Sequence, residues 1–192
     1  LKSPLTSYPG ELTDAERVGG LYRSDDLGRT WKRITTERIL DNAFSFEISP
    51  DGKVWYLSIL SWCERPEDQP FRFYSGGLFR SRDEGKTWER ILKSRNRLGG
   101  GIRQVIVHPC FPQILYALFT ELYERPEYSG VLRSMDGGKS WECISRDAWN
   151  PMQNGIRINP KRPEYLYLLT AGRGLMIGKD LSVEKLLQKR GH

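Results

Sequence analysis

The sequence predicts an all-β fold built from a repeated unit of four short antiparallel strands. Nineteen Gly, eleven Pro, six Trp and nine Tyr in 192 residues are typical of a chain with many turns between buried strands. One segment that ends in Trp recurs three times, about 55 residues apart, and a second segment that ends in Pro alternates with it. The apolar runs between these turns are too short for helices and rich in Val, Ile, Tyr and Trp.

The first repeated segment has the pattern Ser-x-Asp-x-Gly-x-Thr-Trp, with Ser in place of Thr in the third copy, and occupies 20–31, 77–88 and 130–141. Ser and Asp side chains can accept hydrogen bonds from nearby backbone N–H groups and so lock a tight turn. Gly provides a left-handed conformation, and Trp buries a large apolar surface. We therefore assign a structural role to all twelve residues: Ser24, Asp26, Gly28, Trp31, Ser81, Asp83, Gly85, Trp88, Ser134, Asp136, Gly138 and Trp141.

The second repeated segment is a short strand that ends at a Pro turn and is followed by another strand. It covers 46–58, 105–118 and 156–169, with Pro50, Pro109 and Pro160 at the turn. Pro suits this place because it fixes φ and donates no hydrogen bond to a sheet. The two segments together make a unit of four strands, and a repeated unit of this size is a β-propeller blade.

The repeats predict about three and a half blades. Residues 20–35 form the two outer strands of the first blade, 43–92 and 102–145 form two full blades, 155–180 form an incomplete last blade, and 181–192 form a tail. A short helix is expected within 180–190. Propellers close with about four to eight blades, so we expect this chain to be the C-terminal half of a six- to eight-bladed ring, or to close with a second copy. The first residues contain no initiator Met and no signal-peptide core, which indicates a processed or excised piece.

The Ser-x-Asp-x-Gly-x-Thr-Trp segments resemble the Asp-box, or BNR, repeat, over nearly the whole chain. The accompanying Pro and Tyr pattern is more similar to the sortilin, xyloglucanase and photosystem II assembly-factor group than to true sialidases. That group includes glycoside hydrolases, sorting receptors and non-catalytic scaffolds, so the resemblance implies the fold and leaves the function open. It also favours a secreted or periplasmic compartment, which the residues themselves do not determine.

Successive strands of a blade alternate in direction, so the Pro turns and Ser-x-Asp turns belong to one face and the long loops to the other. Ligands are expected at the long loops. Both long loops contain Glu-Arg-Pro-Glu, at 64–67 and 124–127, beside aromatic residues. The predicted binding rim, suited to carbohydrate or protein, contains Trp62, Arg65, Phe71, Phe73, Tyr74, Tyr123, Arg125 and Tyr128. An equally weighted interpretation is that each Arg pairs with a local Glu and only stiffens its loop.

The leading functional hypothesis is a binding or scaffold module, and the alternative is the C-terminal part of a glycoside hydrolase. Hydrolysis requires two carboxyl groups about 5 to 9.5 Å apart, and nothing in the sequence shows which acids converge. The candidates are Glu64, Glu67, Asp68, Glu121, Glu124 and Glu127. Arg103 and Arg157 lie on inner strands and could reach a central channel, but we interpret them as ordinary strand-end arginines.

The net charge of +6 and a row of basic residues on the turn face define a third hypothesis, a plate that docks a polyanion. The row contains Arg23, Arg29, Arg80, Lys86, Arg133 and Lys139. We interpret these residues as exposed charges that maintain solubility, and expect no nucleic acid partner. No cofactor, metal site or membrane span is expected, because Cys63, Cys110 and Cys143 lack ligand spacing, His108 has no catalytic partner, and no apolar run is long enough.

Overall fold

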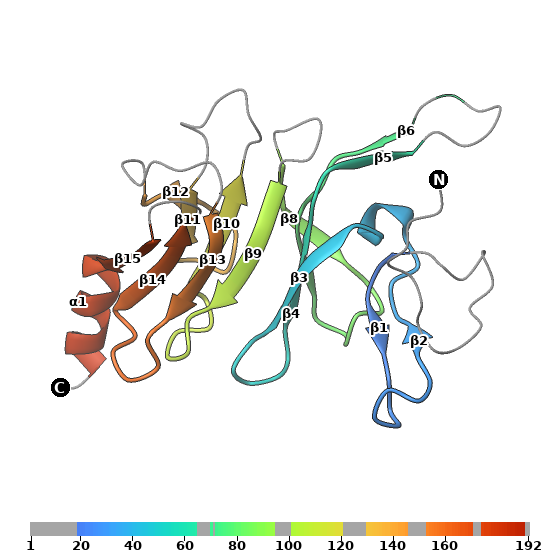
Figure 1. Ribbon diagram of the computed structural model, residues 1–192. Coiled ribbons are helices and arrows are strands. Elements are labelled where there is room, and N and C mark those ends of the chain that lie inside the picture. Colours follow the sequence, from blue (N-terminus) through green and yellow to red (C-terminus); the bar gives the residue numbers. More distant parts are fainter. Residues whose placement is uncertain are drawn as a thin grey trace.

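The computed structural model describes residues 19–64, 70, 72–94, 101–120, 130–145, 153–170 and 174–190. Nearly all regular structure in these residues is antiparallel β (Figure 1). The elements are β1 (Tyr22–Arg23), β2 (Lys32–Arg33), the 3-10 helix η1 (Arg38–Leu40), β3 (Ala43–Ile48), β4 (Trp55–Ile59), β5 (Trp62–Glu64), β6 (Arg72–Tyr74), β7 (Gly77–Ser81), β8 (Glu89–Lys93), β9 (Gly101–Val107), β10 (Leu115–Thr120), β11 (Gly130–Ser134), β12 (Glu142–Cys143), β13 (Gln153–Ile158), β14 (Tyr165–Thr170), β15 (Gly174–Lys179) and α1 (Leu181–Arg190).

These strands form successive sheets, which we number as blades. Blade 1 is β1-β2, blade 2 is β3-β4-β7-β8, blade 3 is β9-β10-β11-β12 and blade 4 is β13-β14-β15. A separate hairpin, β5-β6, extends from the connection between β4 and β7. In Figure 1 the blades stand side by side with β3, β9 and β13 as their first strands, so the predicted all-β fold of partial propeller blades is confirmed.

The three Ser-x-Asp turns have the same hydrogen bonds. In the turn of blade 2, the Ser81 Oγ accepts from Gly85 N at 2.8 Å, and the Asp83 carboxylate accepts from both the N–H (2.9 Å) and the hydroxyl (2.6 Å) of Thr87. The Trp88 indole donates to the Gly85 carbonyl at 3.0 Å. The turns that begin at Ser24 and Ser134 repeat these contacts. The hydrogen bonds hold the Asp83 pKa at about 2, below its ordinary 3.8.

At the three Pro turns, three different side chains accept hydrogen bonds from the backbone of the turn. These turns lie at the lower end of Figure 1, together with the Ser-x-Asp turn of blade 1. The residue before each Pro accepts from backbone N–H groups a few positions later: Ser49 Oγ from Val54, His108 Nδ1 from Cys110 and Phe111, and Asn159 Oδ1 from Lys161 and Arg162. His108 is fully buried, and burial lowers its pKa. Because its Nδ1 accepts from two backbone N–H groups, we assign His108 a structural role at this turn.

Blade 4 ends differently, because α1 follows β15 directly, within the span where a short helix was expected. Asp180 begins this helix, and its carboxylate accepts from the backbone N–H groups of Ser182 and Val183 at 3.0 and 3.2 Å. The same carboxylate accepts a hydrogen bond of 2.9 Å from the Tyr116 hydroxyl and pairs with Arg133 of blade 3. Val183 packs with the blade 3 and blade 4 core, so the helix covers the outer part of that junction.

Two members of the predicted basic row are not exposed charges, which corrects the interpretation from the sequence. Arg80 pairs with Glu89 at 2.7 Å and donates to the Gly137 carbonyl of the next blade at the same distance. Arg133 pairs with Glu142 and with the buried Asp180. The antiparallel register places each Arg opposite a Glu on the outermost strand, so the proposed polyanion plate is interrupted by acids at these positions.

The three tryptophans of the repeat differ in burial. Trp88 and Trp141 are half-buried and pack against core clusters, whereas Trp31 is 59 % exposed. The reason is local: within the described residues β1 and β2 form a sheet of two strands, with no inner strand beside them. The prediction that the Trp of each repeat buries a large apolar surface is therefore wrong for Trp31.

Candidate functional site

The first strand of each of blades 2, 3 and 4 contains one extra residue at the same place. The register of β3 against β4 skips Phe44, that of β9 against β10 skips Arg103, and that of β13 against β14 skips Asn154. All three residues lie six positions before the Pro of the following turn. A β-bulge of this kind redirects a side chain and is frequent beside binding sites. The first strands of these three blades therefore share a bulge at one equivalent position.

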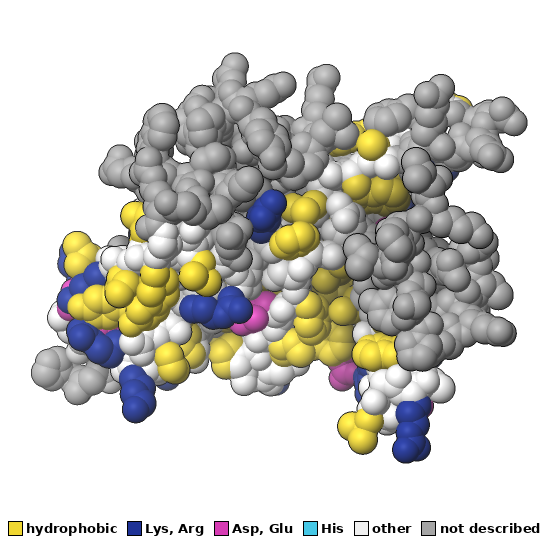
Figure 2. Space-filling view, viewed as in Figure 1, with side chains coloured by type: hydrophobic (Ala, Val, Ile, Leu, Met, Phe, Trp, Pro, Cys, Tyr) yellow, Lys and Arg dark blue, Asp and Glu magenta, His cyan; other side chains and the backbone are white. Residues whose placement is uncertain are grey.

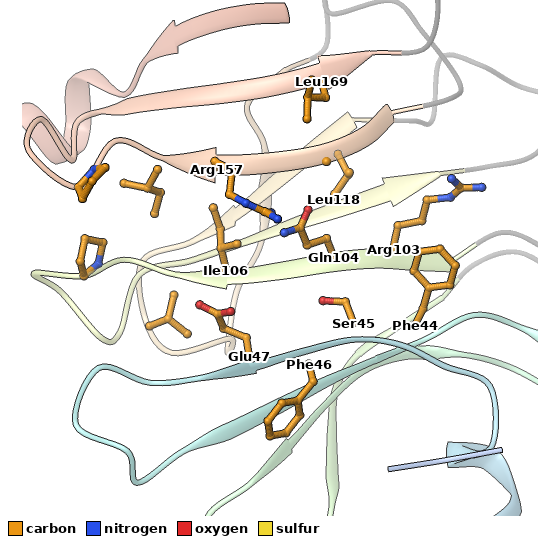
Figure 3. A pocket seen from close by; sticks show the side chains of 15 residues that line it. Phe44, Ser45, Phe46, Glu47, Arg103, Gln104, Ile106, Leu118, Arg157 and Leu169 are labelled. Atoms are coloured by element: carbon orange, nitrogen blue, oxygen red, sulfur yellow. The ribbon is translucent and has the colours of Figure 1, made fainter. Parts of the chain in front are cut away.

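These inner strands line a hollow of about 1000 Å³, which we call the inner-strand hollow. Its wall combines apolar residues such as Ile106, Leu118 and Leu169 with a group of aromatic and polar side chains (Figure 3). That group consists of Phe44, Ser45, Glu47, Arg103, Gln104 and Arg157. Because the group comes from β3, β9 and β13, three blades contribute to one surface.

At one end of the hollow, the two bulged residues Phe44 and Arg103 meet across the blade 2 and blade 3 junction. The Arg103 guanidinium carbon lies 5.6 Å from the centre of the Phe44 ring, a cation–π arrangement (Figure 3). The Arg103 backbone is held in place because its carbonyl accepts a hydrogen bond from the buried Ser58 hydroxyl. The Nε of Arg103 is buried and has no hydrogen-bond partner among the residues that the structure describes.

At the other end, Glu47 of β3 faces Arg157 of β13 across the hollow (Figure 3). Burial raises the pKa of the Glu47 carboxyl, while a hydrogen bond from the Val107 N–H and the charge of Arg157 oppose the rise. Between the two ends, Gln104 accepts a hydrogen bond of 2.9 Å from the Ile156 backbone, which ties β9 to β13. The hollow therefore contains two guanidinium groups and a carboxyl group whose pKa is raised by burial.

The described residues of the hollow are suited to binding. Glu47 is the single carboxyl group among its lining residues, so they do not supply the pair of carboxyls that hydrolysis of a glycosidic bond requires. Nor does the described part of the chain bring together three His, Cys, Asp or Glu side chains that could hold a metal ion. None of its helices is long and apolar enough to cross a membrane.

Only part of the predicted binding rim can be located. Arg65, Phe71, Tyr123, Arg125 and Tyr128, and the acids Glu67, Asp68, Glu121, Glu124 and Glu127, lie outside the described residues, as does the Glu64 side chain. Trp62 and Tyr74 face each other across the β5-β6 hairpin with ring centres 4.4 Å apart, and Arg38 lies over the Trp62 ring. These contacts occupy Trp62 within the hairpin, whereas Phe73 is exposed.

Sequence reasoning missed most of the hollow. Arg103 and Arg157 were interpreted as ordinary strand-end arginines, and Phe44 and Glu47 were not considered, yet all four line its wall. The useful signal was the fixed distance from the Pro turn, which aligns Phe44 with Arg103 and Glu47 with Arg157. The bulge itself has no marker residue, since Phe, Arg and Asn occupy it, so only the register of the paired strands reveals it.

Comparison with known proteins supports the fold. No protein-family model matches the chain. A probable oligoxyloglucan-reducing end-specific xyloglucanase of Neosartorya fischeri is 29% identical over 92 residues, which is 47% of this chain and 11% of that protein. Among solved structures, a GH74 xyloglucanase from Xanthomonas campestris has a TM-score of 0.59 at 19% identity, covering 85% of this chain and 26% of that one. An ancestral GH74 enzyme has a TM-score of 0.58 at 15% identity, covering 84% and 20%.

These similarities cover only a small part of each relative. The chain spans about a tenth of the length of the curated relative and about a quarter or less of the two solved structures. At these identities the structural likeness establishes the shared fold, a portion of a propeller of the kind found in glycoside hydrolases. The activity and ligands of the relatives belong to those larger proteins.

Proposed function

We propose that this chain is the ligand-binding portion of an Asp-box propeller, that its ligand is an oligosaccharide, and that the inner-strand hollow binds it without hydrolysing it. The observation that carries this proposal is the wall of the hollow, where an aromatic ring, two guanidinium groups, an amide and a carboxyl group converge from three blades. The three turns with identical hydrogen bonds support the Asp-box assignment.

An oligosaccharide fits this wall for chemical reasons. Sugar rings present apolar C–H faces, which pack on aromatic side chains such as Phe44, and hydroxyl groups that both donate and accept hydrogen bonds. Arg103 and Arg157 supply donors, and Glu47 supplies acceptors or, when protonated, a donor. The similarity to xyloglucanases makes a xyloglucan oligosaccharide the first ligand to test.

The alternative is a role in hydrolysis, and one observation favours it. A carboxyl group with a raised pKa in a hollow is suited to act as a general acid, and burial raises the pKa of Glu47 in this way. Such a role also needs a second carboxyl group within about 10 Å. Because the described residues of the hollow provide one carboxyl group, we favour binding over catalysis.

The test is calorimetric titration of the 192-residue chain with xyloglucan oligosaccharides, together with an assay for new reducing ends. We expect binding without hydrolysis, and a loss of about tenfold in affinity, or about 1.4 kcal/mol, in Phe44→Ala and in Arg157→Ala. Phe73→Ala, on the β5-β6 hairpin, is the matched control and should bind normally. Binding lost in Phe73→Ala alone would move the site to the long-loop rim, and release of reducing ends that Glu47→Gln abolishes would establish the hydrolase.

A further inference from the structure

Arg103 differs from the other arginines that are partly or fully buried in the described part of the chain. Arg33, Arg80 and Arg133 each pair with at least one carboxylate. Arg103 is also partly buried, but it forms no ion pair with a described residue, and none of its side-chain N–H groups donates to one. A charge removed from water without a counter-charge is unfavourable, so the surroundings of this guanidinium group favour the binding of an anion.

The contacts that Arg103 does make hold it in place and leave its donors unused. Its backbone lies in the bulge of β9, where its carbonyl accepts a hydrogen bond from the buried Ser58 hydroxyl. Its guanidinium group lies over the Phe44 ring, which attracts the positive charge but has no oxygen atom that could accept from an N–H group. A guanidinium group positioned in this way can bind a carboxylate through two parallel hydrogen bonds.

The charges of the inner-strand hollow are unevenly distributed along it. Glu47, its single carboxyl group among the described lining residues, lies three positions before a Pro turn and opposite Arg157. Arg103 and Phe44 lie at the other end of the hollow (Figure 3). Figure 2 shows basic side chains over the inner strands both next to an acidic side chain and, higher up, next to hydrophobic ones. An anionic group of a ligand is therefore expected at the Arg103 end, away from the Glu47 carboxyl.

We propose that the ligand of the hollow is an acidic oligosaccharide, and that Arg103 binds a carboxylate carried by one of its sugar units. The carboxylate accepts from the Arg103 N–H groups, the sugar ring that carries it packs near Phe44, and hydroxyl groups of the neighbouring units reach Glu47 and Arg157. A neutral oligosaccharide leaves the guanidinium group without an anion and should bind more weakly. This inference rests on the proposed function, because it specifies the chemical class of the oligosaccharide.

Calorimetric titration of the 192-residue chain with two forms of one oligosaccharide tests the inference. The first form is a xyloglucan oligosaccharide, and the second is the same compound after its primary alcohols are oxidised to carboxylates. We expect the oxidised form to bind about tenfold more tightly, which is about 1.4 kcal/mol, and this preference to weaken at high salt. Arg103→Gln keeps a hydrogen-bonding amide but removes the charge, so it should bind both forms equally.

Arg90→Gln is the matched control variant. Arg90 also lies over a phenylalanine ring, 5.9 Å from the centre of Phe79, but it is exposed and does not line the hollow. This variant should keep the wild-type preference for the oxidised form. A second measurement follows Arg103 itself: its Nε–H resonance should shift when millimolar glucuronate is added and should not shift with glucose, a difference that a purely structural role would not produce.

The outcomes separate this inference from the proposed function. Wild-type binding of the oxidised form that is equal to or weaker than that of the neutral form would overturn the inference and leave the proposed function intact. The same holds if Arg103→Gln retains the preference, or if glucuronate leaves the Arg103 resonance unchanged. If the wild-type chain binds neither form, the proposed function fails and the inference fails with it. Thermal unfolding of Arg103→Gln near the wild-type temperature shows that a lost preference does not come from misfolding.

Discussion

The turn of blade 3 and the end of blade 4 each have an aspartate at the equivalent position, but the two aspartates have different roles. Asp136 follows β11 and accepts from the backbone and hydroxyl of Ser140, which closes a tight turn. Asp180 is the aligned residue after β15, and it accepts from Ser182 and Val183 at the start of α1. Both carboxylates satisfy backbone N–H groups, but the first closes a hairpin and the second starts a helix.

The difference shows that the aspartate alone does not determine the element that follows. After Asp136 the chain has Gly138 with φ of +90°, which turns it back toward its partner strand. After Asp180 it has a run with good helix-forming residues and no Gly until 191, so the backbone continues as a helix. The buried surroundings differ too, since Asp180 pairs with Arg133 and Tyr116, whereas Asp136 lies at the surface of its turn.

The largest effect should come from Asp180→Ala. This change removes the helix cap, the buried carboxylate that pairs with Arg133 and the acceptor of the buried Tyr116 hydroxyl, while the Arg133 pair with Glu142 remains. We therefore expect a loss of about 3–5 kcal/mol in the free energy of unfolding. Urea denaturation followed by tryptophan fluorescence measures it. Asp25→Ala, which breaks the exposed pair with Arg23, is the control and should cost at most about 1 kcal/mol. Equal losses would show that the buried pair has no special weight.

Gly138→Ala should have the next largest effect, because it combines a left-handed φ with a close contact. A Cβ at this position would lie 2.7 Å from the Ile91 Cδ1 of blade 2, and we expect a loss of about 2–4 kcal/mol. Gly52→Ala has a similar φ of +75° but no atom within 4 Å, and should cost about 1–2 kcal/mol. If the two variants lose equal stability in urea, the tight junction with blade 2 is not required.

Ser134→Ala tests the turn lock itself. It removes the acceptor of the buried Gly138 N–H, so we expect a loss of about 1–3 kcal/mol. Ser24→Ala removes the same hydrogen bond from the exposed turn of blade 1, where water can replace it, and should cost less than about 1 kcal/mol. Thermal unfolding of both variants measures the difference, and a larger loss in Ser24→Ala would refute the ranking by burial.

The smallest effect concerns acid stability. Hydrogen bonds lower the pKa of Asp26 and Asp83 to about 2 from 3.8. A carboxyl with a depressed folded-state pKa stabilises the fold above its ordinary pKa, and this contribution is lost as the pH falls from about 4 to about 2. The urea midpoint of the wild type should therefore fall more steeply over this interval than that of Asp83→Asn. Parallel curves would indicate that the turn aspartates do not contribute.

The repeat made the blades and turns predictable. Trp, Gly, Asp and Pro at fixed spacings indicated strands and turns close to those observed, because each of these residues acts through its own backbone or its immediate neighbours. The burial of Arg80 and Arg133 was not predicted, since it depends on a Glu opposite each Arg and on the turn or helix of the next blade. The exposure of Trp31 likewise follows from which strands stand beside it.

The amino-acid sequence by itself determined the all-β class, the four-stranded unit and its turn chemistry, because hydrogen bonds within a few residues depend only on local residue types. The tertiary structure decided which side chains meet: it placed Glu47 opposite Arg157, set Arg103 over Phe44 through the bulges, and left Phe46 and Leu175 uncovered. Such pairings join residues from different blades. They depend on strand register and on the order of the blades in space, and neither can be deduced from the spacing of residues along the sequence.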